Sequence, residues 1–177
     1  MEILDFTIDP NLFSIEQAKS MGMWPPGDVV AYGIMPYVGR MKVDKVKVLD
    51  VGVMKGENAY IMLELDKNQK IEKIFGVEIN TNEGFEKLVR ENLKGEDRFA
   101  LWDGEVHEGF DVVCINSQTP LDEVLPLYYN MVKSNGIFCG NDHALPHVKD
   151  ALHKFRRDTK IGTPISVSRG SWFWWKR

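Results

Sequence analysis

Short apolar runs typical of buried strands alternate with segments of helical periodicity from residue 46 onward, and this alternation limits the folds open to the chain. It predicts an α/β protein in which helices cover both faces of a mostly parallel sheet. Strands are expected at residues 47–51, 74–78, 98–102, 111–115 and 136–139. Helices are expected between them at residues 56–65, 82–93, 121–132 and 146–160. Pro126 is expected to kink or end the third of these helices.

The C-terminal tail departs from this alternation. Two β-rich runs, at 165–168 and 172–175, flank a tight turn and are expected to pair as a hairpin. The predicted fold class is therefore α/β, a Rossmann-like doubly wound, mostly parallel sheet closed by a C-terminal antiparallel hairpin. Only residues 103–109 separate the third and fourth strands, which is too short for a crossover helix. The third strand is expected at an edge, with residues 1–45 or a second subunit covering the thin face.

Length and composition exclude several classes of protein. A chain of 177 residues is expected to fold as one domain, residues 46–177, preceded by an N-terminal extension or lid, residues 1–45. No apolar run approaches the roughly 20 residues that span a bilayer. The net charge of -4 argues against binding to nucleic acid. Cys114 and Cys139 lie in apolar runs, which is typical of a reducing cytosol, so a cytoplasmic protein with a small-molecule partner is expected. A homodimer remains open.

The stretch "VKVLDVGVMKGENAY" joins the first strand to the first helix. Gly52 and Gly56 leave the backbone bare at the carboxyl edge of the sheet, where doubly wound folds bind ligands. Met54 stands between them, so the spacing is G-x-x-x-G rather than the G-x-G-x-x-G of dinucleotide-binding proteins. Asp50 lies just before Gly52, and an acid there disfavours an anion and favours a ligand with a cationic end.

Acidic residues also follow the next two predicted strands. Glu78 ends the second strand, where an acid typically binds the two hydroxyls of a ribose. Asp103 follows the third strand and is expected to accept from an adenine amino group, while Trp102 shapes a flat apolar slot. A cationic amino acid, a ribose and a base together describe S-adenosylmethionine better than NAD.

The segments "VLDVGVMKGENA", "FGVEI", "FDVVCIN" and "NGIFCGNDH" resemble the class I S-adenosylmethionine-dependent methyltransferases, and among them the branch of small-molecule and sugar O-methyltransferases. The resemblance covers roughly residues 46–177. It implies that a bulky residue is usual at the position of Met54. The expected cofactor-binding residues are Asp50, Gly52, Met54, Gly56, Glu78, Trp102, Asp103 and Asn116.

Methyl transfer to a hydroxyl requires that the acceptor lose its proton, either to a base or through coordination to a metal that lowers its pKa. The resembling O-methyltransferases hold a divalent metal with one acid after the fourth strand and with an acid pair, or an acid and an amide, after the fifth. The corresponding residues here are Asn116, Asn141 and Asp142, which retain a single carboxylate. Two readings therefore stay open: a weak Mg²⁺ site completed by water and substrate, or no metal.

A route without metal uses His143 as the general base, because an imidazole titrates near neutral pH. Asp142 is expected to orient it, so these two residues form the expected catalytic pair. Just before the first strand, Met35, Tyr37 and Arg40 are expected to form a lid over the cofactor or acceptor.

The sequence thus predicts methyl transfer from S-adenosylmethionine to a small-molecule acceptor, such as a hydroxyl of a sugar or similar metabolite. Two alternatives remain. The amides of Asn116 and Asn141 fit a protein that binds S-adenosylmethionine or S-adenosylhomocysteine without transferring a methyl group. A nicotinamide oxidoreductase shares the acid at Glu78, although its glycine motif is absent.

Overall fold

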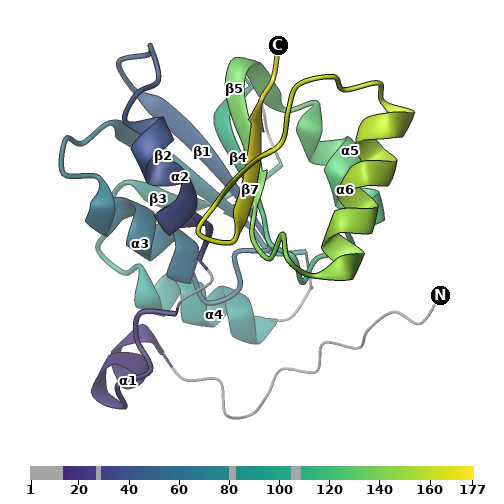
Figure 1. Cartoon of the computed structure of the whole chain (residues 1–177). Helices are drawn as coiled ribbons and strands as arrows, with labels where there is room; N and C mark the ends of the chain where they lie inside the picture. Colours follow the sequence, from purple (N-terminus) through teal and green to yellow (C-terminus); the bar gives the residue numbers. More distant parts are fainter. Residues whose placement is uncertain (1–13, 27–28, 80–82, 105–108) are drawn as a thin grey trace.

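The structure is a computed structural model that describes residues 14–26, 29–79, 83–104 and 109–177. These residues form a seven-stranded sheet with the order β3-β2-β1-β4-β5-β7-β6 (Figure 1). The strands are β1 (Val46–Val51), β2 (Ile71–Val77), β3 (Phe99–Leu101), β4 (Phe110–Ile115), β5 (Val132–Gly140), β6 (Ser166–Ser168) and β7 (Ser171–Trp175). The first five strands pair in parallel, and β7 runs antiparallel to both β5 and β6.

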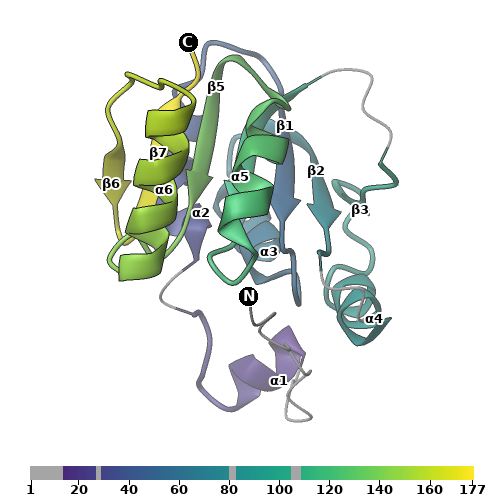
Figure 2. The ribbon, with the colours of Figure 1, turned by 90° about the vertical axis from the view of Figure 1, so that its right-hand side faces the viewer.

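Helices cover both faces of the sheet. Helices α2 (Val30–Val38) and α3 (Glu57–Leu65) lie on one face, and α5 (Leu121–Tyr129) and α6 (Pro146–Asp158) lie on the other (Figure 1). Helix α4 (Glu83–Asn92) contributes to the core on the α3 face. Helix α1 (Ile15–Ser20) lies outside these layers, near the edge at which the parallel strands end (Figure 2).

Each face of the sheet has its own apolar core, as expected when parallel strands are covered on both sides. In β1, Val48 joins the core under α2 and α3, whereas its neighbour Leu49 joins the core under α5 and α6. Trp172 and Trp174 are fully buried in the second core and stack with ring centroids 5.3 Å apart. Among the described residues, no helix has the length and apolar character needed to cross a membrane.

The parallel strands and the closing hairpin lie where the sequence predicted them, although β2 and β5 begin earlier than expected. The hairpin turns at Arg169 and Gly170, whose φ angles of 51° and 79° are typical of a type I′ turn. Pro126 does not end its helix. Helix α5 continues through it to Tyr129, because Leu125 and Tyr128 on either side are buried against the core.

Helix α2, which contains Pro36, was not predicted. It packs over β5, β6 and β7 and beside α3, and its residues Ile34 and Val38 are completely buried. Helix α2 therefore covers the end of the sheet that lies away from β3. The N-terminal segment was expected to cover the thin face beside β3 instead. The approach to the hairpin is close: a Cβ added at Gly33 would lie 2.5 Å from the Ser168 carbonyl oxygen and 2.6 Å from the Ser171 Cβ.

Gly33→Ala is expected to lower the free energy of unfolding by about 1–3 kcal/mol, because the added methyl group forces α2 away from the hairpin. The better helix propensity of alanine, worth at most about 1 kcal/mol, offsets only part of this loss. Gly39→Ala is the matched control, since its Cβ would meet the Met35 carbonyl at an ordinary 3.7 Å. Urea denaturation of both variants tests the prediction, and equal stabilities would contradict it.

Candidate functional site

A cavity of about 280 Å³ opens at the carboxyl edge of the sheet, beside the ends of β1, β4 and β5. The loop after β1 and the first turn of α3 form one wall, and the segment leading into α2 forms another. Among the described residues, the lining consists of Pro26, Val29, Val30, Asp50, Gly52, Val53, Met54, Lys55, Glu57, Asn58, Asn116, Gln118 and Asn141. Doubly wound folds bind their ligands at this edge.

The turn after β1 requires a glycine at position 52. Gly52 has a φ of 76°, and an added Cβ would lie 2.6 Å from Cγ2 of Thr119 and 3.0 Å from Cβ of Asn116. Its N–H donates to the Val77 carbonyl at 2.8 Å, which fastens the turn to the end of β2. Both the left-handed backbone and the close approach of the loop after β4 exclude a side chain here.

Met54 occupies a left-handed conformation, with a φ of 50°, although it is not a glycine. Its N–H donates to Oε2 of Glu78 at 3.0 Å, and its sulfur accepts from Nδ2 of Asn116 at 3.4 Å. This backbone conformation is uncommon outside glycine, and the two contacts hold it in place. A bulky residue fits between the two glycines because its side chain joins the cavity wall.

Asp50 is the buried acid of the cavity, with 3% of its surface exposed. Its Oδ1 accepts a hydrogen bond from Nδ2 of Asn58 at 2.9 Å. Its Oδ2 is buried and has no hydrogen-bond partner within the part of the chain that the structure describes. A buried carboxylate oxygen without a donor raises the free energy of the protein. This oxygen therefore marks a place where a cationic or donating ligand group would be stabilised.

Burial raises the pKa of Asp50 from 3.8 to about 7. The hydrogen bond from Asn58 lowers this pKa, whereas the charges of Glu57 and Glu78 raise it further. The folded state consequently binds the Asp50 proton more tightly than the unfolded state does. The contribution of Asp50 to stability therefore falls as the pH rises from about 4 to about 7, and is constant above that range.

Asp50→Asn is expected to remove this pH dependence. Relative to the variant, the wild type should lose about 2–3 kcal/mol of unfolding free energy between pH 5 and pH 8, since each pKa unit corresponds to about 1.4 kcal/mol. Urea denaturation of both proteins at the two pH values measures the difference. Parallel pH profiles would contradict the raised pKa.

Four of the predicted cofactor residues line the cavity, namely Asp50, Gly52, Met54 and Asn116. Gly56, with a φ of 87°, is the N-cap residue of α3. Glu78 follows β2, and its Oε2 accepts a hydrogen bond from the Met54 N–H in the loop after β1. Trp102 and Asp103 follow β3, and β2 separates that strand from β1. The Trp102 ring packs into the core on the α5 face, while Asp103 is exposed.

The predicted metal ligands lie at the ends of β4 and β5, where their side-chain oxygens accept hydrogen bonds from neighbouring residues. Oδ1 of Asn116 accepts from the Gln118 N–H at 3.0 Å, and Oδ1 of Asn141 accepts from the Ser117 N–H at 2.8 Å. Oδ2 of Asp142 accepts from the Ser117 hydroxyl and from Nδ2 of Asn141. This network joins the turn after β4 to the turn after β5.

These residues do not fit an Mg²⁺ site. The side-chain oxygens of Asn116 and Asn141 each accept a hydrogen bond from the backbone, and Mg²⁺ prefers more carboxylate charge than Asp142 supplies. No group of three or more His, Cys, Asp or Glu side chains is placed to hold a metal in the described ranges.

The predicted catalytic pair is not joined in the structure. The backbone N–H of His143 donates to the Gly170 carbonyl at 3.0 Å, which places His143 beside the β6–β7 turn. In the described part of the chain, no hydrogen bond connects its imidazole to Asp142, which belongs to the network above. Burial, followed by the charges of Lys149 and His153, lowers the pKa of His143. The imidazole is therefore neutral near pH 7 and able to accept a proton.

The residues expected to form a lid lie elsewhere. Met35 and Tyr37 of α2 pack against the core, and Arg40 is exposed. The N-terminal part of the chain contributes to the cavity through Pro26, Val29 and Val30.

Sequence reasoning also missed several residues of the lining. Lys55 lies in the quoted glycine loop and forms an ion pair with Glu57, with 3.4 Å between Nζ and Oε1. Asn58 is a polar residue in the first turn of α3, directly after the glycine loop, which was an available signal. Gln118 lies two residues after Asn116, so its position in the sequence was a similar signal.

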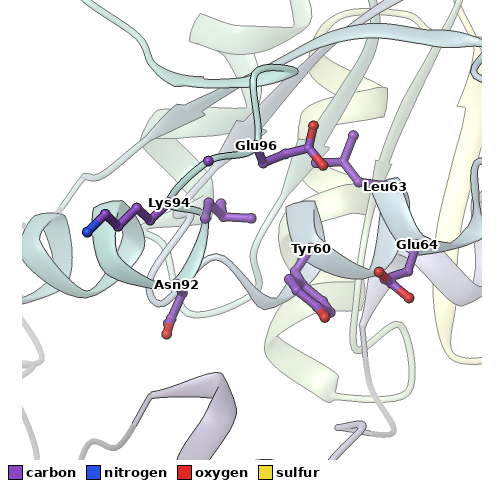
Figure 3. Close-up of a pocket in the computed structure, with 8 residues that line it drawn as sticks. Tyr60, Leu63, Glu64, Asn92, Lys94 and Glu96 are labelled. Atoms are coloured by element: carbon purple, nitrogen blue, oxygen red, sulfur yellow. The ribbon is translucent and has the colours of Figure 1, made fainter.

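A second cavity, of about 230 Å³, lies between α3 and the end of α4 (Figure 3). Helix α1 is fastened to residues of its lining. Nζ of Lys19 donates to the Tyr60 hydroxyl at 2.6 Å, and the Ile15 N–H donates to Oδ1 of Asn92 at 3.1 Å. None of the residues predicted for the functional site is part of its described lining.

Solved structures of methyltransferases are similar to this chain. A proposed caffeoyl-CoA O-methyltransferase from Staphylococcus aureus has a TM-score of 0.67 and 14% identity, over 94% of this chain and 93% of that chain. An O-methyltransferase from Bacillus cereus, in complex with SAH, has a TM-score of 0.63 and 12% identity, over 91% and 88%. A ribosomal protein L11 methylase from Lactobacillus delbrueckii subsp. bulgaricus has a TM-score of 0.54 and 18% identity, over 81% and 77%. No family model and no curated protein matches the chain.

The chain therefore has the fold of the class I S-adenosylmethionine-dependent methyltransferases, as the sequence resemblance implied. The names of these neighbours refer to caffeoyl-CoA in one case and to a ribosomal protein in another. The shared fold consequently specifies neither the acceptor nor the sugar-modifying branch.

Proposed function

We propose that this protein is an S-adenosylmethionine-dependent methyltransferase that acts on a small molecule, at a hydroxyl of a sugar or similar metabolite. The observation that carries the proposal is Asp50, a buried carboxylate whose Oδ2 has no hydrogen-bond partner among the described residues and which lines a cavity in a methyltransferase fold. The methionine part of the cofactor carries an ammonium and a sulfonium group. A positive charge near Asp50 stabilises its ionised form and offsets the cost of its burial.

The remaining predicted cofactor residues support binding along the ends of β1, β2 and β3. Glu78 is assigned to the ribose hydroxyls, and its bond to the Met54 N–H holds it at the edge of the loop. Asp103 and Trp102 are assigned to the adenine. When bound, S-adenosylmethionine supplies an electrophilic methyl group.

The acceptor side of the cavity carries three amide side chains, those of Asn116, Gln118 and Asn141. Amides both donate and accept hydrogen bonds, which suits an uncharged polyhydroxylated molecule. We assign His143 as the base that accepts the hydroxyl proton, because its lowered pKa keeps the imidazole neutral. The alternative of a binding protein without transfer activity is suggested by Asn116 and Asn141, which stand at the positions that hold the metal in the resembling enzymes.

Calorimetric titration with S-adenosylmethionine and S-adenosylhomocysteine tests the cofactor half of the proposal. The wild type is expected to bind both, and Glu78→Ala is expected to weaken binding at least about tenfold, because a charged hydrogen bond is worth about 1.5–3 kcal/mol. Glu123→Ala, an exposed acid on α5, is the matched control and should bind like the wild type. Absence of binding by the wild type would refute the proposal, and binding of NAD in its place would favour an oxidoreductase.

Production of S-adenosylhomocysteine in the presence of a panel of polyhydroxylated acceptors tests the transfer step. His143→Ala is expected to lower kcat about 100-fold and to leave S-adenosylhomocysteine affinity unchanged, since a general base contributes about that much. His147→Ala, at an exposed position on α6, is the control. Binding without turnover on any acceptor would favour the binding protein, and an unchanged kcat in His143→Ala would remove the assigned base.

A further inference from the structure

The side-chain amide of Asn58 joins two parts of the cavity wall. Asn58 is the second residue of α3. Its Nδ2 donates to Oδ1 of Asp50 at 2.9 Å, and its Oδ1 accepts from the backbone N–H of Ala31 at 2.9 Å. One amide therefore contacts both the buried acid at the end of β1 and the first turn of α2.

The bond to Ala31 determines which way the amide faces. Ala31 is completely buried, and its N–H lies in the first turn of a helix, where no intrahelical acceptor is available. Val29, at the N-cap of α2, has no side-chain acceptor, so Asn58 caps α2 from the neighbouring helix. Since the amide oxygen must face the Ala31 N–H, the amide nitrogen must face Asp50.

This orientation gives the two oxygens of Asp50 different roles. Oδ1 is held by Asn58, and Oδ2 is left buried without a partner among the described residues. We infer that Asn58 is a positioning residue, which holds Asp50 so that Oδ2 receives the positively charged group of the ligand. The inference rests on the proposed function, in which that ligand is S-adenosylmethionine or S-adenosylhomocysteine.

Other charged and titratable groups also surround Asp50. Glu57 on α3 and Glu78 after β2 act against ionisation of Asp50, and Cys114 on β4 is its partner in the sheet register. Lys55, in the cavity lining, is paired with Glu57. The hydrogen bond from Asn58 is the contact that most strongly favours the ionised form of Asp50. Its removal should therefore raise the pKa of Asp50 further.

The test is a pH series of S-adenosylhomocysteine affinity, measured by calorimetry on the wild type and on Asn58→Leu. In the wild type, affinity should rise as the pH passes about 7, the pKa of Asp50. In Asn58→Leu, affinity at pH 8 should fall about tenfold, and the midpoint of the pH profile should move upward. A purely structural role would weaken binding equally at every pH. Asn68→Leu, the same change at an exposed turn, is the matched control.

Asn58→Asp separates the two contacts of the amide. Its carboxylate still accepts from the Ala31 N–H, but it no longer donates to Asp50 and adds a like charge. Asn58→Asp should keep α2 capped and remain folded even if Asn58→Leu unfolds. The midpoint of its pH profile should still move upward. An unshifted midpoint in both variants would overturn the inference.

A second measurement needs no ligand. Titration of the Asp50 side chain by carbon NMR should show a higher pKa in both Asn58 variants than in the wild type. If the wild type fails to bind S-adenosylhomocysteine but the Asp50 titration shifts, the proposed function fails and Asn58 still orients the acid. If binding occurs and the titration does not shift, the positioning role is wrong.

Discussion

Burial of the Asp50 carboxylate at the end of the central strand β1 is the constraint on which the site depends. The carboxylate has little contact with water, and its second oxygen has no partner within the described ranges, so the ligand-free protein carries an electrostatic cost. The loop after β4 closes against Gly52, and the first turn of α3 presents Asn58 to the acid. These features remove an acid from solvent at the wall of a cavity, where a ligand that carries positive charge would offset the cost of its burial.

Contacts of helix α2 join it both to the closing hairpin and to the site. Helix α2 packs on the β6–β7 hairpin at Gly33, where the two backbones approach too closely for any larger residue. At its start, the Ala31 N–H is bound by Asn58. The hairpin, α2 and the cavity wall thus form one packed unit. The part of the chain that follows residue 29 consequently contributes both to the core and to the site.

Sequence patterns predicted the strands and the hairpin because apolar periodicity and turn residues are local signals. The loop from Asp50 to Met54 was predicted for the same reason, and it lies in the cavity. Contacts between distant segments, such as that of Asn58 with Ala31, leave no periodic pattern and were missed. The pairing of His143 with Asp142 was inferred from adjacency in the chain. Asp142 instead has a φ of 56° and hydrogen-bonds to the turn after β4, so adjacent residues serve different contacts.

A crystal structure of the protein grown with S-adenosylhomocysteine tests the central claim most directly. The account predicts ligand density in the cavity at the end of β1, with the ammonium group within hydrogen-bond distance of Oδ2 of Asp50 and the ribose near Glu78. Density only in the cavity between α3 and α4, or an ammonium group directed away from Asp50, would contradict it.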